Sequence, residues 1–161
     1  MTQTTTHRAT VTLPADDQIL ITREFDAPAR LVWRAWTEPE LVRRWYGGTH
    51  GEVVSAEIDL RVGGRWRYVT RAGDGPEAAF HGVYREIVAG ERIVSTEVFE
   101  GAPDAESVNT LTLTEDGGRT LMTVLVQHQS RANRDAVLQA GMESGMNAAL
   151  DGLERVARSL G

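Results

Sequence analysis

Residues 63–99 read GGRWRYVTRAGDGPEAAFHGVYREIVAGERIVSTEVF. Runs of β-branched and aromatic residues alternate in this stretch with short clusters of turn residues, such as Gly73-Asp74-Gly75-Pro76. This alternation is typical of strands joined by tight turns. We predict strands at Arg65–Arg71, Ala79–Val88 and Arg92–Glu100. Because sequential strands with such short connections pair with their neighbours, the stretch predicts an antiparallel meander.

The same pattern continues on both sides of this stretch. It predicts one strand before it, Gly51–Leu60, and two after it, Ser107–Thr114 and Arg119–Gln129. A first strand, Gln18–Phe25, lies near the N-terminus, where Ile19, Ile21 and Phe25 alternate with other residues. The chain therefore supplies seven strands, of which the last six follow one another directly.

Helical patterns flank the meander. Between the first two strands, apolar residues recur at helical spacing within residues 28–37, and Pro39–Trp45 repeats this pattern more briefly. From about Arg131 the apolar period changes from 2 to 3.6, and Ser130 is placed to cap a helix. This helix would run for nearly thirty residues, roughly 40 Å at 1.5 Å per residue.

The order of these elements predicts the fold class. An antiparallel sheet with one apolar face needs a cover, and the long amphipathic helix is the element able to provide it. We expect an α+β helix-grip fold of order β-α-α-β6-α, whose seven-stranded curved antiparallel sheet wraps a long C-terminal helix. Such a sheet leaves a cavity at one end of the helix. A chain of 161 residues suits a single domain, which we place at residues 16–161 after a flexible N-terminal segment, residues 1–15.

Composition argues against several classes of protein. The absence of cysteine excludes disulfides and thiolate metal sites, and the absence of lysine excludes Schiff-base catalysis. A net charge of −6 disfavours a nucleic-acid partner. No apolar run reaches the roughly 18 residues of a membrane span, and no secretory signal opens the chain, so we expect a cytoplasmic protein. Metal-binding and Rossmann motifs are missing as well, so we predict no metal and no cofactor.

Four motifs together point to a family. They are FDAPARLVWRAWTEPELVRRWYGG at residues 25–48, DLRVGGRWRYV at 59–69, FHGVYREIVAGERIVSTEVFEG at 80–101, and GGRTLMTVLVQHQSRANRDAVLQAGMESGMNAALDGLERV at 117–156. From about Gln18 onward the chain resembles the activator of heat-shock-protein-90 ATPase homologues, within the START-like (SRPBCC) superfamily. It corresponds to the C-terminal, START-like part of the two-domain eukaryotic activators. The resemblance implies a bacterial stand-alone module that binds a small molecule, and it allows a chaperone partner.

Aromatic side chains on the strands are candidates to line the cavity. Trp66 and Tyr68 share one face of their strand, and Phe80, Gly82 and Tyr84 share a face of the next. Gly82 lies between two rings and leaves a gap that a helix or a ligand could fill. Flat rings with a polar handle suit a ligand cavity, but ordinary core packing is the alternative interpretation.

Two polar residues could act inside the same cavity. Glu97 shares a strand face with Phe99, and if buried it needs an arginine partner such as Arg67 or Arg85, or its pKa rises. His128 ends the last strand on an apolar face, where it is either a general base or a histidine bonded to the backbone. The residues expected to line the cavity are Trp45, Trp66, Tyr68, Phe80, Tyr84, Glu97, Phe99, His128, Met142 and Met146.

These residues are compatible with three functions. The first, which we favour, is a non-enzymatic module that binds a small hydrophobic or amphipathic molecule between the sheet and the C-terminal helix. The second is a cyclase- or hydratase-type enzyme, which requires at least two polar side chains to converge in the same cavity. The third is a chaperone-interacting module, from the family resemblance. For each of these functions we expect a monomer or a homodimer.

Overall fold

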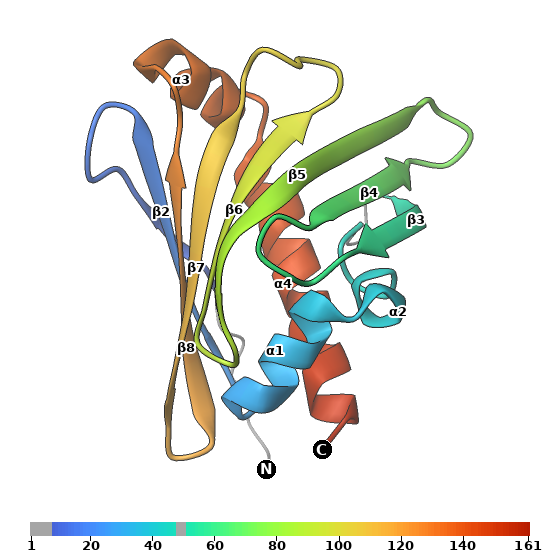
Figure 1. Ribbon diagram of the computed structural model, residues 1–161, viewed down its shortest axis with the longest axis vertical. Helices are drawn as coiled ribbons and strands as arrows, with labels where there is room; N and C mark the ends of the chain where they lie inside the picture. The colour runs from blue at the N-terminus through green and yellow to red at the C-terminus, as the bar shows by residue number, and fades with distance from the viewer. Residues whose placement is uncertain (1–7, 48–50) are drawn as a thin grey trace.

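The computed structural model describes residues 8–47 and 51–161, which form one curved antiparallel sheet and four helices (Figure 1). The strands are β1 Thr10–Thr12, β2 Gln18–Phe25, β3 Glu52–Ile58, β4 Arg65–Arg71, β5 Glu77–Val88, β6 Arg92–Phe99, β7 Ser107–Asp116 and β8 Arg119–Gln127. The helices are α1 Ala29–Thr37, α2 Pro39–Val42, α3 Arg131–Gln139 and α4 Met142–Ser159. The sheet order β1-β2-β8-β7-β6-β5-β4-β3 contains the predicted meander from β3 to β8.

The sheet has eight strands, so the predicted number of seven was wrong. The additional strand is β1, which pairs with β2 at the edge of the sheet, with Thr10 opposite Thr22. Three residues are too few to show an alternating pattern in the sequence. β1 lies within residues 1–15, whose first seven residues are outside the described part of the chain. The division of the chain at residue 15 stays a prediction.

The C-terminal helical region is two helices, so the single long helix was also wrong. Ser130 caps α3 as predicted, because its hydroxyl oxygen accepts a hydrogen bond of 3.1 Å from the backbone N–H of Asn133. The helix then ends, and Gly141 starts α4 with a φ of +78°. This left-handed conformation is accessible to glycine at little cost, and it breaks the helical hydrogen-bond ladder. The helical spacing of apolar residues continues from α3 into α4, so the sequence pattern does not indicate the break between them.

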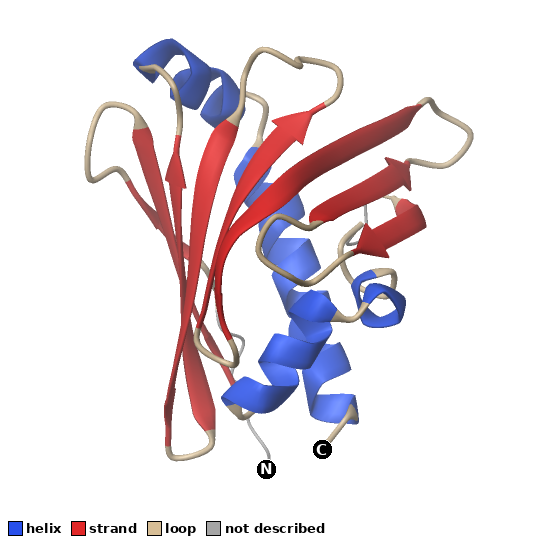
Figure 2. Ribbon diagram, in the orientation of Figure 1, coloured by secondary structure: helices blue, strands red, loops and turns tan. Residues whose placement is uncertain are grey.

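Helix α4 runs along the concave side of the sheet, and α1 packs against α4 (Figures 1 and 2). The side chains between them form the core, which includes Phe25, Val32, Met122 and Leu153. These four side chains are almost completely removed from water, which supplies the main driving force for folding. The α+β architecture with a curved sheet around a C-terminal helix is confirmed.

An arginine on β2 also forms ion pairs that connect α4 to the sheet. Arg23 is 1% exposed, and its Nη1 lies 2.9 Å from Oδ1 of Asp151 on α4. Its Nη2 lies 3.5 Å from Oε1 of Glu154, one turn further along the helix. The guanidinium also lies over the ring of Phe25, 5.1 Å from the ring centroid. The strand pattern places Arg23 on the apolar face, where its charge requires these partners.

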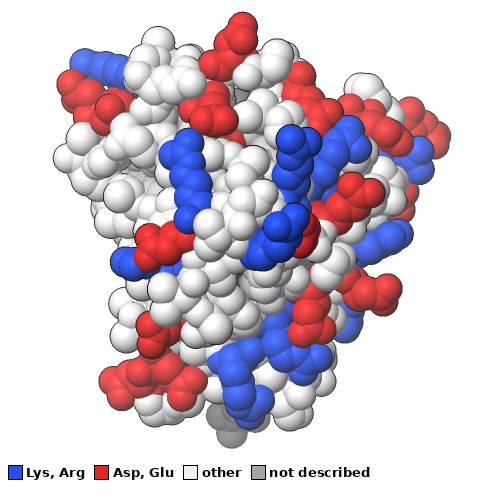
Figure 3. Space-filling view, in the orientation of Figure 1, with Lys and Arg blue, Asp and Glu red and all other residues white. Residues whose placement is uncertain are grey.

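Charged side chains of both signs interleave over the face of the molecule drawn in Figure 3. Exposed ion pairs also lie across the outer face of the sheet, including Arg67 on β4 with Glu100, directly after β6, at 2.8 Å. Exposed pairs of this kind contribute little to stability, because water screens the two charges. Among the described residues, none of the helices combines the length and the apolar character needed to cross a membrane.

Candidate ligand-binding site

The space between the concave face and α4 is filled unevenly. Along the C-terminal half of α4, Met122 and Leu153 are almost completely buried. Along the N-terminal half, Met142 and Met146 on the helix are only half-buried, as is Val126 near the end of β8. These three side chains pack against the core but are only partly covered by it. These half-buried side chains therefore leave part of their apolar surface accessible around the N-terminal half of α4.

Aromatic rings form a continuous row beside this accessible surface. Tyr46 lies edge-on to Tyr68, with ring centroids 4.8 Å apart, and Tyr68 lies 4.8 Å from Trp66. Phe80 continues the row, 6.1 Å from Tyr46 and 5.2 Å from Phe99. Tyr46 was not among the predicted cavity residues. Trp45 is the last residue of the predicted helical pattern. Tyr46 follows it in an irregular loop, where no periodicity indicates that its side chain points toward β4.

The gap expected above Gly82 is filled by the protein itself. Trp66 pairs with Gly82 across β4 and β5, and its indole Nε1 donates a hydrogen bond of 3.2 Å to the backbone oxygen of Thr96. A Cβ atom at position 82 would lie 2.5 Å from this nitrogen and 1.8 Å from the Thr96 oxygen. Gly82 is therefore required for the close approach of Trp66 to the sheet, and no space for a ligand remains there.

Glu97 points into the same region of the concave face. Its Oε1 accepts a hydrogen bond of 3.0 Å from Nδ2 of Asn109, and the backbone pairs it with Ser107 on β7. Burial raises the pKa of the Glu97 carboxyl above its ordinary value, although the bond from Asn109 opposes this rise. The two arginines considered as its partners bind elsewhere, since Arg67 pairs with Glu100 and Arg85 with Glu106. Since no arginine pairs with Glu97 among the described residues, the geometry favours the raised pKa over the ion pair.

Three tyrosine hydroxyls belong to this polar region. Burial raises the pKa values of Tyr46, Tyr68 and Tyr84 above their ordinary value, and the charge of Glu97 adds to the rise for Tyr46 and Tyr68. The hydroxyls of Tyr68 and Tyr84 share a hydrogen bond. All three phenols are therefore neutral at physiological pH and remain able to donate a proton in a hydrogen bond.

The structure gathers most of the predicted residues into one region. Those that belong to the core cluster or pack against it are Trp45, Trp66, Tyr68, Phe80, Tyr84, Met142 and Met146. Trp45 packs edge-on against Tyr46, with ring centroids 5.8 Å apart, and its indole donates a 2.8 Å hydrogen bond to the backbone oxygen of Ala35. Phe99 lies at the rim and is 43% exposed. Whether any of these residues contacts a ligand stays a prediction.

His128 lies directly after β8, at the end of the sheet next to α3. It is 8% exposed, and its backbone N–H donates a hydrogen bond of 2.8 Å to the backbone oxygen of Asp17. Its ring nitrogen Nε2 is buried without a hydrogen-bond partner among the described residues. Burial lowers the pKa of the imidazole, and the charge of Arg134 on α3 lowers it further. The ring is therefore kept neutral.

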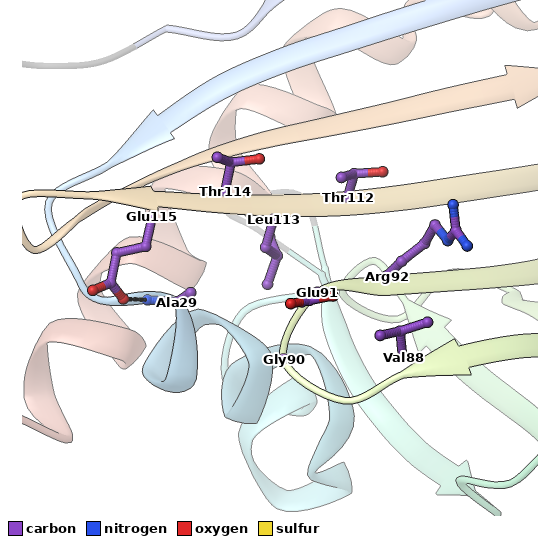
Figure 4. Close-up of a pocket in the computed structure, with 9 residues that line it drawn as sticks. All are labelled: Ala29, Val88, Gly90, Glu91, Arg92, Thr112, Leu113, Thr114 and Glu115. Atoms are coloured by element: carbon purple, nitrogen blue, oxygen red, sulfur yellow. Dashed lines mark hydrogen bonds between the residues drawn. The ribbon is translucent and has the colours of Figure 1, made fainter.

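An open pocket of about 600 Å³ lies at the opposite end of the fold (Figure 4). It is bounded by the start of α1, the turn between β5 and β6, and β7; its lining residues include Glu91, Leu113 and Glu115. The carboxylate of Glu115 accepts a 2.7 Å hydrogen bond from the backbone N–H of Ala29 at the first turn of α1. None of the ten predicted residues lines this pocket. In the described part of the chain, no group of three His, Asp or Glu side chains is arranged to hold a metal ion.

A family model for activator of Hsp90 ATPase homologue 1-like proteins matches residues 26–158. The chain belongs to this family. The match spans every element of the concave site, from α1 to nearly the end of α4. The family resemblance drawn from the four sequence motifs is therefore confirmed. No curated protein matches the chain.

Solved structures share the fold of this family member. A protein from Rhodobacter sphaeroides superposes with a TM-score of 0.88 at 21% identity, covering 94% of this chain and 99% of that one. One from Arthrobacter aurescens has a TM-score of 0.83 at 26% identity, covering 93% of this chain and 91% of that one. An AHSA1-like protein from Aeromonas hydrophila has a TM-score of 0.64 at 21% identity, with coverages of 88% and 93%. The identities of 21% establish the shared fold alone.

The two carboxylates Glu97 and Glu100 lead to opposite predictions for stability. A group whose pKa is higher in the folded state than in the unfolded state stabilises the fold at pH values below its unfolded-state pKa. This contribution is lost as the pH rises through the folded-state pKa. Wild-type protein therefore carries a cost at pH 7 from Glu97 that the neutral variant Glu97→Gln avoids. We expect Glu97→Gln to be more stable than wild type at pH 7 in urea unfolding, with the difference shrinking toward pH 4.

Glu100 provides the matched control. Hydrogen bonds from Arg67 and His81 lower the pKa of Glu100 to about 2, so its contribution is present at neutral pH and is lost as the pH falls toward that value. Glu100→Gln should therefore destabilise the protein at pH 7, with the difference disappearing in acid. If both Glu97→Gln and Glu100→Gln stabilise the protein at pH 7, or if neither does, burial of the Glu97 carboxyl does not lower the stability of the wild type.

His128 predicts a further pH dependence. Because its folded-state pKa lies below the unfolded value near 6.5, the unfolded chain binds the proton more readily. The stability that neutral His128 contributes is present above that value and is lost as the pH falls through the folded pKa. We expect the free-energy difference between wild type and His128→Gln to shift in favour of the variant between pH 7.5 and pH 5, measured by urea unfolding. A free-energy difference that does not change between pH 7.5 and pH 5 would contradict a lowered pKa of His128 in the folded protein.

Proposed function

We propose that this protein binds a small hydrophobic or amphipathic molecule between the concave face of the sheet and the N-terminal half of α4. The observation that carries this proposal is the half-buried apolar surface of Met142, Met146 and Val126, because Val126 lies opposite Asn109, which holds the half-buried carboxyl of Glu97. Ligand sites combine apolar walls with a few fixed polar groups in this way. The apolar part of the ligand would lie against the methionines, and its polar part would reach Glu97.

Two features support placing the ligand there. Methionine side chains adapt their shape to irregular partners, and two of them lie one turn apart on α4 where its cover of the sheet is incomplete. In addition, Glu97 lies on the concave face although a neutral residue would avoid the cost of burying its charge. Groups that reduce stability in this manner are enriched in functional sites.

The test is the titration of the protein with N-phenyl-1-naphthylamine, an uncharged apolar fluorophore. Wild type should bind it saturably, and Val126→Trp should weaken binding by about tenfold or more, because the indole would occupy the accessible surface. Leu125→Trp is the matched control, since Leu125 is also half-buried but faces the other side of the sheet. Equal binding by both variants would overturn the proposed location, and no saturable binding by wild type would overturn the function.

An enzyme of the cyclase or hydratase type is the second candidate. The observation that favours it is the grouping of Glu97 with the hydroxyls of Tyr68 and Tyr84, because a carboxyl with a raised pKa is suited to donate a proton. Catalysis would be abolished in Glu97→Gln while binding of the fluorophore persists. A variant that retains turnover of a substrate would exclude Glu97 as the acid. A chaperone partner, the monomeric or homodimeric state and the cytoplasmic location stay predictions.

A further inference from the structure

Glu97 has no cationic partner within the described part of the chain. No arginine or histidine nitrogen of these residues lies within 4.0 Å of its carboxyl group, although the sequence places Arg67 and Arg85 on neighbouring strands. Both arginines instead pair with carboxylates on the outer face. Asn109 donates one hydrogen bond to Oε1, and none of the described residues bonds Oε2. Oε2 therefore has no partner among the described residues and can accept a hydrogen bond from a bound molecule.

Aromatic rings share the concave face of the sheet with Glu97. Phe99 lies two residues further on β6 and therefore on the same face of the sheet, and Phe80 lies opposite Phe99 on β5. Tyr68 lies opposite Phe80 on β4, and Tyr46 packs against both of these rings. The face of an aromatic ring carries partial negative charge and attracts cations. Ring faces and a carboxylate thus favour the same kind of partner.

We propose that the molecule bound at this site is an amphipathic amine, whose protonated nitrogen pairs with Oε2 of Glu97 against the rings of Phe80 and Tyr68. This proposal rests on the proposed binding function and specifies its ligand class. A protonated amine supplies a donor to Oε2 and neutralises the charge of the carboxyl, so binding removes the cost of burying Glu97 on the concave face. An anionic ligand would meet repulsion from the carboxylate and the ring faces. The net charge of −6 also attracts cations to the protein.

The test compares three probes with the same chain length: octylamine, octanol and octanoate. Each is titrated against wild-type protein loaded with N-phenyl-1-naphthylamine, and displacement of the fluorophore gives its dissociation constant. We expect octylamine to bind about tenfold or more tightly than octanol, and octanoate to bind most weakly, because a buried charge-assisted contact distinguishes them. Glu97→Gln should abolish the preference for the amine over the alcohol, whereas Glu100→Gln on the outer face should retain it.

The outcomes separate the ligand class from the binding function. Two outcomes overturn the amine and leave the binding function intact. In the first, octanol displaces the fluorophore as effectively as octylamine does. In the second, Glu97→Gln still prefers octylamine to octanol. A preference for octanoate also overturns the amine. If none of the three probes displaces a saturably bound fluorophore, the amine is overturned, whereas a fluorophore that does not bind saturably overturns both proposals. A preference for octylamine lost in Glu97→Gln and kept in Glu100→Gln establishes the amine site.

Discussion

Replacing Trp66 by alanine is expected to lower the free energy of unfolding by about 3–5 kcal/mol, the range typical of a buried large aromatic side chain. Trp66 is 6% exposed, packs against Tyr68, and donates a hydrogen bond from its indole to the oxygen of Thr96. Gly82 opposite has no side chain, so nothing on that strand can fill the cavity left by the indole. The loss should appear as a lower midpoint in urea unfolding with an unchanged slope.

Phe99→Ala is the control for this prediction. Phe99 is an aromatic residue on the same face of the sheet, but it is 43% exposed, so its removal should cost about 1 kcal/mol or less. A similarly small loss for Trp66→Ala would mean that Trp66 lines an open cavity. The gap above Gly82 would then be available to a ligand, in contradiction to the packing described above.

Replacing Arg23 by methionine should cost about 3 kcal/mol, because removing one partner of a buried ion pair leaves the other charge uncompensated. Glu154 is mostly buried and Asp151 is partly exposed, so the larger share of the loss should come from Glu154. Methionine keeps an apolar side chain over Phe25, which separates the loss of charge from the loss of packing. The measurement is the urea unfolding free energy at pH 7.

Two further variants test the cause of this effect. Arg34→Met removes an exposed pair between Arg34 on α1 and Glu38 directly after it, and should leave the stability almost unchanged. Adding Glu154→Gln to Arg23→Met should restore part of the lost stability, since the stranded carboxylate is then neutral. Additive losses in the double variant would show that Arg23 acts through packing and not through its charge.

The alternating strands and their turns were predictable because each strand has one face on the core and one facing water. This contrast gave seven of the eight strands, and the change of period at Arg131 located the C-terminal helical region. Three features escaped this reasoning. β1 is too short for a pattern, Gly141 breaks the helix through a backbone angle, and the partners of Arg23 lie more than a hundred residues away in the sequence.

The candidate site was predictable to the extent that it depends on strand faces. The alternation of β6 placed Glu97 on the concave side together with Phe99, and the raised pKa was one of two outcomes foreseen for a buried carboxyl. Asn109 could not be identified as its partner, because this contact depends on the register between β6 and β7. Tyr46 was missed for a similar reason, since it reaches Tyr68 from an irregular segment after α2.

Methionine methyl groups provide the most direct test of where a ligand binds. Met142 and Met146 border the concave site, whereas Met122 is buried beside Leu113, which lines the pocket at the opposite end of the fold. The measurement is the methyl NMR spectrum of protein labelled with ¹³C at the methionine methyl groups, recorded while octanol is added. We expect saturable shifts of Met142 and Met146 with Met122 unchanged. Shifts of Met122 alone, or no saturable shift of any of the three, would contradict a ligand site between the sheet and α4.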